Sequence, residues 1–143
     1  MEVFRLIVSR DSSDIITCDV GMKVRDVIAL LAEKRIGALP VMQDGRVVGI
    51  FSERDVIYKL AAEGALCLDR EISEVMTKDP ITVTPDTKVD HALALMTRRR
   101  IRHLPVIEGD NMQGFISIGD LVKSRIDEVQ SEAEAMRSYI QTA

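Results

Sequence analysis

The stretch "GIFSERD" at residues 49–55 recurs, with the same first, fourth and seventh letters, as "GFISIGD" at residues 114–120. The two copies lie 65 residues apart. Shifted by that distance, residues 15–56 align with residues 80–121 without a gap, and 14 of the 42 aligned pairs are identical. A register kept over so many positions indicates an internal duplication. The chain therefore contains two related units.

Each unit carries the same predicted order of secondary structure. A short extended segment, at residues 15–18 or 80–83, is followed by a helix with apolar residues at helical spacing. Those residues are Val24, Val27, Ile28 and Leu31 in the first unit and Val89, Ala92, Leu93 and Met96 in the second. The stretches "IGALPVM" and "IRHLPVI" predict a strand, with a proline that suits a strand edge or start. A turn containing "DG" or "EGDN" leads to a second strand, "RVVGIF" or "MQGFIS", and Ser52 or Ser117 then opens a final helix.

These elements predict an α/β (α+β) fold of two β-α-β-β-α repeats packed with pseudo-two-fold symmetry, because neither repeat alone is long enough for a comfortable core. We place the first repeat with an N-terminal segment at residues 1–62, a connector at 63–79, the second repeat at 80–124 and a C-terminal helix extension at 125–143. The last helix is expected to run from Ser117 to about residue 140. Its apolar residues follow a heptad pattern: Val122, Ile126, Val129, Ala133, Met136 and Ile140. This stripe packs either on its own domain or against a second copy of the chain.

The composition is that of a soluble globular protein, with 143 residues, 46% apolar, 29% charged and a net charge of −4. The negative charge argues against a general role in binding nucleic acid or a membrane surface. Cys18 and Cys67 lie far apart and outside any C-x-x-C pattern, which indicates reduced thiols. Since no long apolar run is present, we expect a cytoplasmic protein with neither a signal peptide nor a membrane span.

The sequence shows no set of residues that would indicate catalysis. The two histidines, His91 and His103, stand apart, and we find no metal-ligand cluster, P-loop or G-x-G-x-x-G motif. We therefore expect no enzyme activity, no catalytic residue and no bound metal.

The Ser-x-x-Asp spacing in both units has two interpretations. A serine that opens a helix, with an acidic residue three positions later, is close to a capping box, in which each side chain bonds the other's backbone N–H. Such a box prefers Glu or Gln at the later position, however, whereas both copies use Asp, and each serine directly follows a strand. A helix N-terminus beside a strand end also attracts phosphate and ribose groups. The motif thus predicts capping, ligand binding or both.

The residues described so far resemble those of the cystathionine-β-synthase (CBS) domain family, arranged as a tandem pair. The resemblance rests on "EVMTKDPITVTPDTKVDHALALM", "RIGALPV", "RIRHLPV", "GIFSERD" and "GFISIGD", and it covers about residues 15–124. The first repeat departs from the family pattern at residues 18–21, "CDVG", where the second repeat keeps the usual form as "VTPD" at residues 83–86.

The resemblance implies two related adenosine sites between the repeats. In each site, the Asp of the motif would hold the ribose hydroxyls, the Ser would lie near the phosphate, and the other repeat would supply the adenine pocket. One site would join Asp120 and Ser117 with Thr17, Cys18, Ile36, Gly37 and Ala38. The other would join Asp55 and Ser52 with Thr82, Thr84, Ile101, Arg102 and His103.

The basic run "TRRRIRH" at residues 97–103 makes these two sites unequal. Its first two arginines suit a helix C-terminus. Arg102 and His103 follow that helix and would offer a phosphate fork-shaped and imidazolium donors, whereas the first repeat has Gly37 and Ala38 in their place. Aromatic residues do not interleave with the basic ones, so RNA or DNA binding is disfavoured.

We therefore expect a free-standing regulatory module that senses an adenine nucleotide, with AMP or ATP as the first candidates and NAD as another. The alternative is a ligand-free interaction module that regulates a partner enzyme or transporter. The resemblance also implies a homodimer, since similar pairs associate through their helices, and the stripe on the last helix would contribute to its interface.

Overall fold

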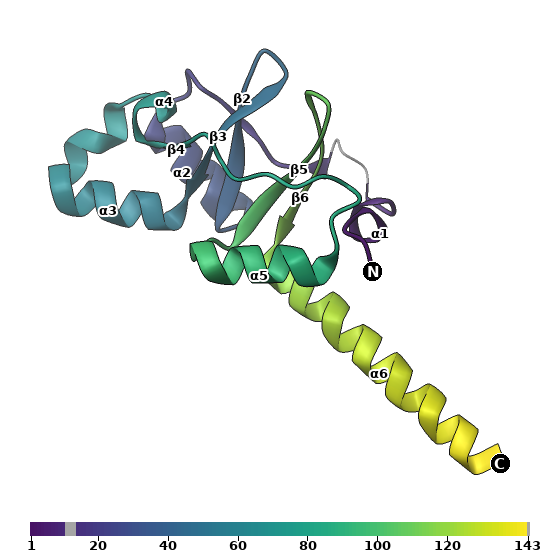
Figure 1. Cartoon of the computed structure of the whole chain (residues 1–143). Helices are drawn as coiled ribbons and strands as arrows, with labels where there is room; N and C mark the ends of the chain where they lie inside the picture. Colours follow the sequence, from purple (N-terminus) through teal and green to yellow (C-terminus); the bar gives the residue numbers. More distant parts are fainter. Residues whose placement is uncertain (11–13, 143) are drawn as a thin grey trace.

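The structure, a computed structural model, describes residues 1–10 and 14–142 (Figure 1). The first repeat contains β1 (Cys18–Asp19), α2 (Val24–Lys34), β2 (Ala38–Gln43), β3 (Arg46–Ser52) and α3 (Glu53–Glu63). The second contains α5 (Val89–Arg99), β5 (His103–Glu108), β6 (Asn111–Ser117) and α6 (Ile118–Thr142). A short helix, α1 (Phe4–Ile7), comes first, and η2 (Gly64–Asp69), α4 (Ile72–Val75) and β4 (Thr77–Lys78) connect the repeats. The predicted α+β fold of two repeats with a long last helix is confirmed.

The start of the second repeat differs from the prediction, because residues 80–83 do not form a strand. Val83 makes a single parallel bridge to Val106, whereas β1 pairs with β2 through Cys18 and Val41. The two pairs are related by the 65-residue shift, so the pairing is kept although the strand is too short to count as one. β4 lies in the predicted connector and extends the first sheet, whose order is β1-β2-β3-β4; β5 and β6 form the second sheet.

The two hairpins share their register and their irregularity. β2 pairs antiparallel with β3, and β5 with β6, and each ladder shifts register directly after the valine of "LPV". In the first hairpin, Asp44 and Gly45 have φ of 52° and 79°. Two successive residues with positive φ are typical of a type I′ turn, whose twist matches that of the strands it joins. The "DG" dipeptide therefore fixes this register locally.

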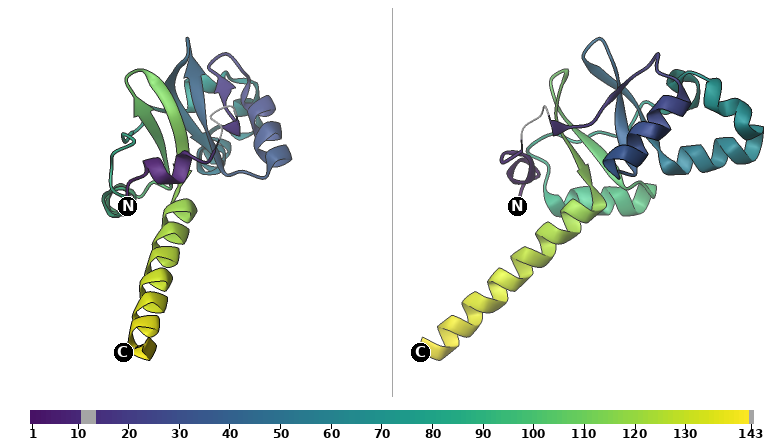
Figure 2. Two further views of the ribbon diagram at one scale, coloured as in Figure 1. Left: turned by 90° about the vertical axis from the view of Figure 1, so that its right-hand side faces the viewer. Right: turned by 180° about the vertical axis from the view of Figure 1, so that it is seen from behind.

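The N-terminal residues pack on the second repeat, although the sequence grouped them with the first. Val3 and Ile7 lie in the core of the second repeat, among residues of α5, β5 and β6. Ile72 and Val75 of α4 lie in the core of the first repeat instead. Each repeat is thus completed by the short helix that precedes the other repeat in the chain, an exchange that ties the two halves together (Figures 1 and 2).

Equivalent backbone hydrogen bonds hold the two exchanged segments. The N–H of Val89, at the start of α5, donates to the carbonyl of Met1 at 2.9 Å. The N–H of Val24, at the start of α2, donates to the carbonyl of Arg70 at 2.9 Å. Because these N–H groups open a helix, they have no partner within it, and the exchanged segments satisfy them.

The glycine of each Gly-apolar-apolar motif makes room for the exchanged segments. A Cβ atom at Gly49 would lie 2.5 Å from Sδ of Met76, directly after α4. A Cβ atom at Gly114 would lie 2.6 Å from Cγ2 of Ile7, the last residue of α1. Both distances are far inside van der Waals contact. The repeated glycine is therefore a packing requirement of the exchange.

The last helix leaves the body of the molecule. Leu121 and Ser124 of α6 are buried, whereas almost every residue from 125 to 142 is exposed. With 25 residues at about 1.5 Å each, α6 is roughly 37 Å long and projects past the repeats (Figures 1 and 2). Among the helices of residues 1–10 and 14–142, none is long and apolar enough to cross a membrane.

Candidate functional site: two cavities between the repeats

Both Ser-x-x-Asp motifs form capping boxes. The N–H of Ser52 donates to Oδ2 of Asp55 at 2.9 Å, and the N–H of Asp55 donates to Oγ of Ser52 at 3.4 Å. The N–H of Ser117 donates to Oδ2 of Asp120 at 2.9 Å, and the N–H of Asp120 donates to Oγ of Ser117 at 3.1 Å. The capping interpretation of the motif is confirmed. Capping occupies mainly one carboxylate oxygen, which leaves the other for a different partner.

The second oxygen of each carboxylate contacts the chain just after an exchanged helix. Oγ1 of Thr77 donates to Oδ1 of Asp55 at 3.3 Å. Arg10 donates to both oxygens of Asp120, at 3.1 Å to Oδ1 and 3.4 Å to Oδ2. Burial on its own would raise the pKa of Asp120, but the hydrogen bonds and charge of Arg10 and the bonds from Ser117 hold that pKa below its ordinary value. Asp120 is therefore ionised at neutral pH.

Cavity 1 lies beside the second motif and has a volume of about 570 Å³. Its second-repeat wall contains Ser117, Phe115 and Gly114, and its first-repeat wall contains residues 14–16 and 36–38. Ile7 and Arg10 from the N-terminal segment also line it. The cavity thus combines three parts of the chain that are distant in sequence, and isoleucines form much of its surface.

Cavity 2 lies beside the first motif and has a volume of about 330 Å³. Ser52, Asp55 and the neighbouring Arg54 line it from the first repeat. Residues 79–81 and 100–103 line it from the second repeat. Residues 79–81 correspond to residues 14–16, and 101–103 to 36–38, under the 65-residue shift. The two cavities are therefore equivalent surfaces of the duplicated fold.

The structure brings most of the candidate site residues to these cavities. Ser117 lines cavity 1 together with Ile36, Gly37 and Ala38. Ser52 and Asp55 line cavity 2 together with Ile101, Arg102 and His103. Asp120 borders cavity 1, because both residues that bond its carboxylate, Ser117 and Arg10, line that cavity.

Four candidate residues of the adenine pockets do not line either cavity: Thr17, Cys18, Thr82 and Thr84. Cys18 is 4% exposed and belongs to the core of the first repeat, where burial raises the pKa of its thiol to about 12. Thr84 instead bonds Asp86 and Thr87 within its own turn. The chain lines the cavities just before these residues, at residues 14–16 and 79–81. It then turns into the core to pair with "LPV".

His103 lies between the two cavities and lines both. Its ring stacks on Phe115, with centroids 5.3 Å apart and planes 11° from parallel. Burial lowers the pKa of His103, and the opposing charge of Asp120 does not offset it. His103 is therefore a neutral imidazole at neutral pH, not the imidazolium that the sequence suggested, and the permanent charge beside it comes from arginine.

Several residues of the cavities were missed by the sequence interpretation: Arg10, Asp14, Arg54, Asp79, Arg100 and Phe115. Arg10 was missed because the 65-residue shift does not extend to the N-terminus. A second alignment, which pairs Glu2 with Glu71 and Ile7 with Met76, would have found this segment. Its offset is four residues longer than the first one, so an alignment without gaps does not include both.

The charges around the two cavities differ. Arg10 lines cavity 1, and Asp120 already pairs with it. Cavity 2 has three arginines in its wall, Arg54, Arg100 and Arg102, together with the carboxylates of Glu53, Asp55 and Asp79. Nη1 of Arg54 donates to the carbonyl of Arg100 at 3.5 Å. No group of three or more His, Cys, Asp or Glu residues within 1–10 and 14–142 is arranged to hold a metal ion.

Comparison with known proteins agrees with this architecture. The model of the CBS domain matches residues 7–62 and again residues 72–127. The chain belongs to the CBS domain family. A CBS-domain protein from Burkholderia ambifaria MC40-6 is 39% identical, with a TM-score of 0.81 over 89% of this chain and 95% of that one. The mitochondrial CBS domain-containing protein CBSX3 of Arabidopsis thaliana is 37% identical over 129 residues. That match covers 87% of this chain but 63% of the relative, so this CBS pair spans less than two thirds of that protein.

A third similar structure contains ligands. The CBS domain pair of protein MJ0100, solved in complex with 5′-methylthioadenosine and S-adenosyl-L-methionine, is 25% identical to this chain. Its TM-score is 0.73, over 86% of this chain and 98% of that one.

Proposed function

We propose that this CBS domain pair is a non-catalytic regulatory module that binds an adenosine-containing ligand in cavities 1 and 2. The observation that carries the proposal is the position of the two motif carboxylates. Each one follows a strand, caps a helix and borders a cavity whose opposite wall comes from the other repeat. A carboxylate in this position accepts charge-assisted hydrogen bonds from ribose hydroxyls, while the helix N-terminus favours an anion.

The residues of each cavity fit the parts of such a ligand. Asp55 and Asp120 would hold the ribose, and Ser52 and Ser117 would face the phosphate or its equivalent. Arg102 would add charge in cavity 2, with His103 as an uncharged donor. Apolar residues would enclose the adenine ring: Ile15 and Ile16 with residues 36–38 in cavity 1, and Pro80 and Ile81 with Ile101 in cavity 2.

The ligand itself is proposed by chemical class. AMP and ATP remain the first candidates, and NAD is another, because all three carry an adenosine and a phosphate. The MJ0100 complex adds 5′-methylthioadenosine and S-adenosyl-L-methionine, which carry the adenosine without a phosphate. A cytoplasmic location, a homodimer and a regulated partner enzyme or transporter are the remaining parts of the proposal.

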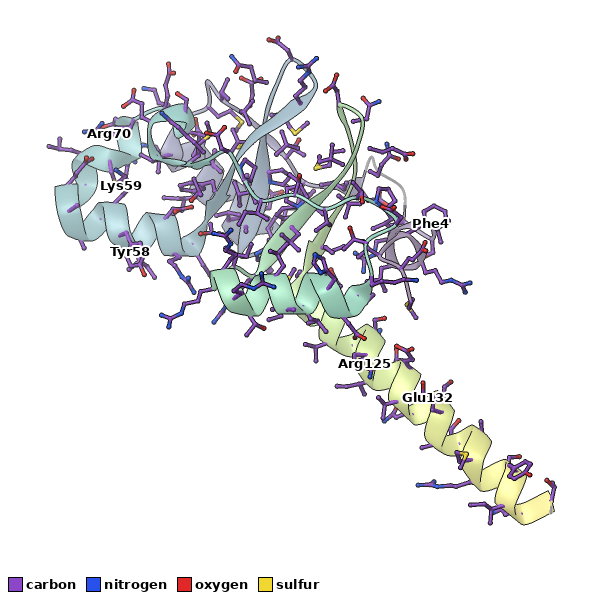
Figure 3. All side chains as sticks on the ribbon, in the orientation of Figure 1. Phe4, Tyr58, Lys59, Arg70, Arg125 and Glu132 are labelled. Atoms are coloured by element: carbon purple, nitrogen blue, oxygen red, sulfur yellow. The ribbon has the colours of Figure 1, made fainter. Side chains whose placement is uncertain are left out.

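A second function, a ligand-free interaction module, is favoured by exposed apolar residues on α3 and η2. Ile57, Tyr58 and Leu66 are 63%, 64% and 78% exposed. Figure 3 shows Tyr58 on α3, pointing away from the body of the first repeat. Side chains of this kind are common in protein interfaces. Both functions need the same fold, so a measurement of ligand binding is needed to distinguish the sensor from the interaction module.

Thermal unfolding of the full chain tests the proposal. We expect at least one of AMP, ATP, NAD, 5′-methylthioadenosine and S-adenosyl-L-methionine to raise the unfolding temperature, with GMP as the matched control. A ligand at a hundredfold excess over its Kd stabilises the folded state by about 2.7 kcal/mol. Mass spectrometry of small molecules released on denaturation identifies a ligand that is retained during purification. If no adenosine compound stabilises the protein, the interaction module is the better description.

A further inference from the structure

The outer part of α6 presents an apolar stripe that the described part of the chain leaves uncovered. Five of its residues are between 42% and 68% exposed: Val122, Ile126, Val129, Met136 and Ile140. Together with Ala133 they repeat with steps of four and three residues. This spacing places them along one side of the helix, at the a and d positions of a heptad repeat. An exposed stripe of this length on a helix that projects from its domain indicates a binding surface.

The stripe and the body of the molecule lie on different sides of α6. The residues that bury α6 against the second repeat, Leu121 and Ser124, occupy heptad positions c and f, away from positions a and d. Arg125 flanks the stripe, and it pairs with Asp90 of α5 at 3.7 Å and with Glu128 at 3.2 Å (Figure 3). A second helix can therefore approach the stripe without displacing the repeats.

We propose that α6 forms a parallel, in-register, two-stranded coiled coil with α6 of a second copy of this chain. Glu132 occupies a g position and Arg137 the e position of the following heptad. In a parallel dimer the g residue of one helix lies beside that e residue of the other. Glu132 of each copy therefore meets Arg137 of its partner, and the two-fold symmetry makes this attractive pair twice.

The antiparallel arrangement is disfavoured by the same charges. When two helices overlap the whole stripe in opposite directions, g positions face g positions and e positions face e positions. Glu132 then lies opposite Glu132 of the partner copy, and Lys123 lies opposite Arg137 of the partner copy. Both pairs carry like charges. Charge complementarity thus selects a second copy of this chain, in parallel orientation, as the occupant.

The arrangement also has a consequence for the cavities. The capping box of Ser117 and Asp120 borders cavity 1 and opens α6. The same continuous helix then forms the coiled coil. The parallel dimer therefore places the cavity 1 walls of two copies at the same end of the coil. The stripe spans only about two and a half heptads, which is short for an isolated coiled coil, so contacts between the bodies would add to it.

Disulfide trapping tests the orientation. In the variant Ile140→Cys, the new thiols sit at a positions near the far end of the coil, where only a parallel dimer brings them together. We expect mild oxidation to link most of the chains, whereas the control Ser138→Cys, at an outward f position, should link few. The wild type is the second control, because Cys18 and Cys67 are 4% and 0% exposed. A dimer in which Ile140→Cys links no better than Ser138→Cys would overturn the parallel orientation.

Sedimentation of variants without the added cysteine tests whether the apolar stripe of α6 forms the dimer interface. Val129→Asp with Met136→Asp places charges in the stripe and should raise the dissociation constant of the dimer by about a hundredfold. Glu132→Arg and Arg137→Glu should each weaken the dimer, and the two changes together should restore it. Circular dichroism confirms that the variants are folded. A monomeric wild type at micromolar concentration, or a dimer that Val129→Asp with Met136→Asp leaves intact, would overturn the proposal.

Discussion

Cavity 1 and cavity 2 are built from equivalent segments of the two repeats, yet their charges differ. Cavity 1 is larger, at about 570 Å³ against 330 Å³, and its arginine, Arg10, is already paired with Asp120. Cavity 2 holds three arginines, and one of them, Arg54, replaces the glycine found in the second motif. The duplication has kept the backbone and the carboxylates, whereas the residues around them have diverged.

The difference in charged residues between the two cavities indicates which residues would select the class of ligand. The carboxylates are common to both cavities, so under the proposed function they would hold the part that all candidate ligands share, the ribose. Arg102 and His103 of cavity 2 are replaced by Gly37 and Ala38 in cavity 1, and Arg54 by Gly119, whereas Arg35, the counterpart of Arg100, does not line cavity 1. We therefore expect phosphorylated ligands to prefer cavity 2 and ligands without a phosphate to be accepted by cavity 1.

Removal of the motif carboxylates should have the largest effect on binding. Asp55→Ala should weaken binding in cavity 2, and Asp120→Ala in cavity 1, each by about 1.5–3 kcal/mol, because charge-assisted hydrogen bonds to ribose are lost. Isothermal titration calorimetry measures both affinity and the number of sites. Each variant should keep the site that the other one loses.

The fold should survive these changes, because loss of a cap residue costs about 1 kcal/mol. Thermal unfolding without ligand provides this control. Titrations that match the wild type for both variants would show that the carboxylates only cap their helices.

Substitution of the two motif glycines by alanine should lower the free energy of unfolding by different amounts. Gly49→Ala brings a Cβ atom to 2.5 Å from Sδ of Met76 and 2.9 Å from the backbone oxygen of Thr77. At Gly114 the nearest atoms all belong to the side chain of Ile7, at 2.6 Å or more. Because backbone yields less readily than a side chain, Gly49→Ala should cost more of the free energy of unfolding, within an overall range of about 1–3 kcal/mol. Urea denaturation measures both variants, and equal costs would argue against this account.

Replacement of the basic residues of the second repeat should reduce the difference between the two cavities in their affinity for phosphorylated ligands. Arg102→Gly with His103→Ala gives the second repeat the residues of the first. Binding of a phosphorylated adenosine ligand should weaken about tenfold and become less dependent on salt, because one fork-shaped donor is absent while Arg54 and Arg100 remain. Binding of adenosine should change little, which calorimetry at two salt concentrations can check. Two identical sites in the wild type, insensitive to salt, would contradict the comparison.

The smallest expected effect is a pH dependence that arises from His103. Burial lowers its pKa in the folded protein below the ordinary value of 6.5, so the unfolded chain binds the proton more readily. The free energy of unfolding should therefore fall as the pH drops through 6.5, and it should recover as the pH rises. His103→Ala, which installs the equivalent residue of the first repeat, should flatten the profile between pH 7 and pH 5. An unchanged slope in that variant would assign the pH dependence to other groups.

Much of the fold could be predicted because its signals are local. The spacing of Val24, Val27 and Leu31 predicted a helix whose buried face is now observed, and "DG" predicted the turn between β2 and β3. Ser52 and Ser117 were predicted to open helices, and both do. In each case a few neighbouring residues decide the backbone conformation, so the pattern can be recognised without the rest of the molecule.

The site was predicted less completely because its walls come from distant segments. The sequence analysis assigned Ile36, Ile101 and Cys18 to the sites. In the structure Ile36 and Ile101 line the cavities, whereas Cys18 lies in the core. A short strand alternates between core and surface, and the sequence did not show where it turns inward. The sequence analysis placed His103 beside the cavity but expected a protonated ring. Its pKa is lowered by burial among residues that are distant in the chain, which the sequence alone does not show.

By itself, the sequence determined the duplication, the order of helices and strands, the two capping motifs and the heptad stripe of α6. These follow from residue type and spacing, which act over a few positions along the chain. Only the tertiary structure shows that α1 completes the second repeat and α4 the first, that Arg10 bonds Asp120 across 110 residues, and that His103 lies half-buried between the two cavities. Such contacts depend on how whole elements pack, and packing joins residues without regard to their distance in sequence.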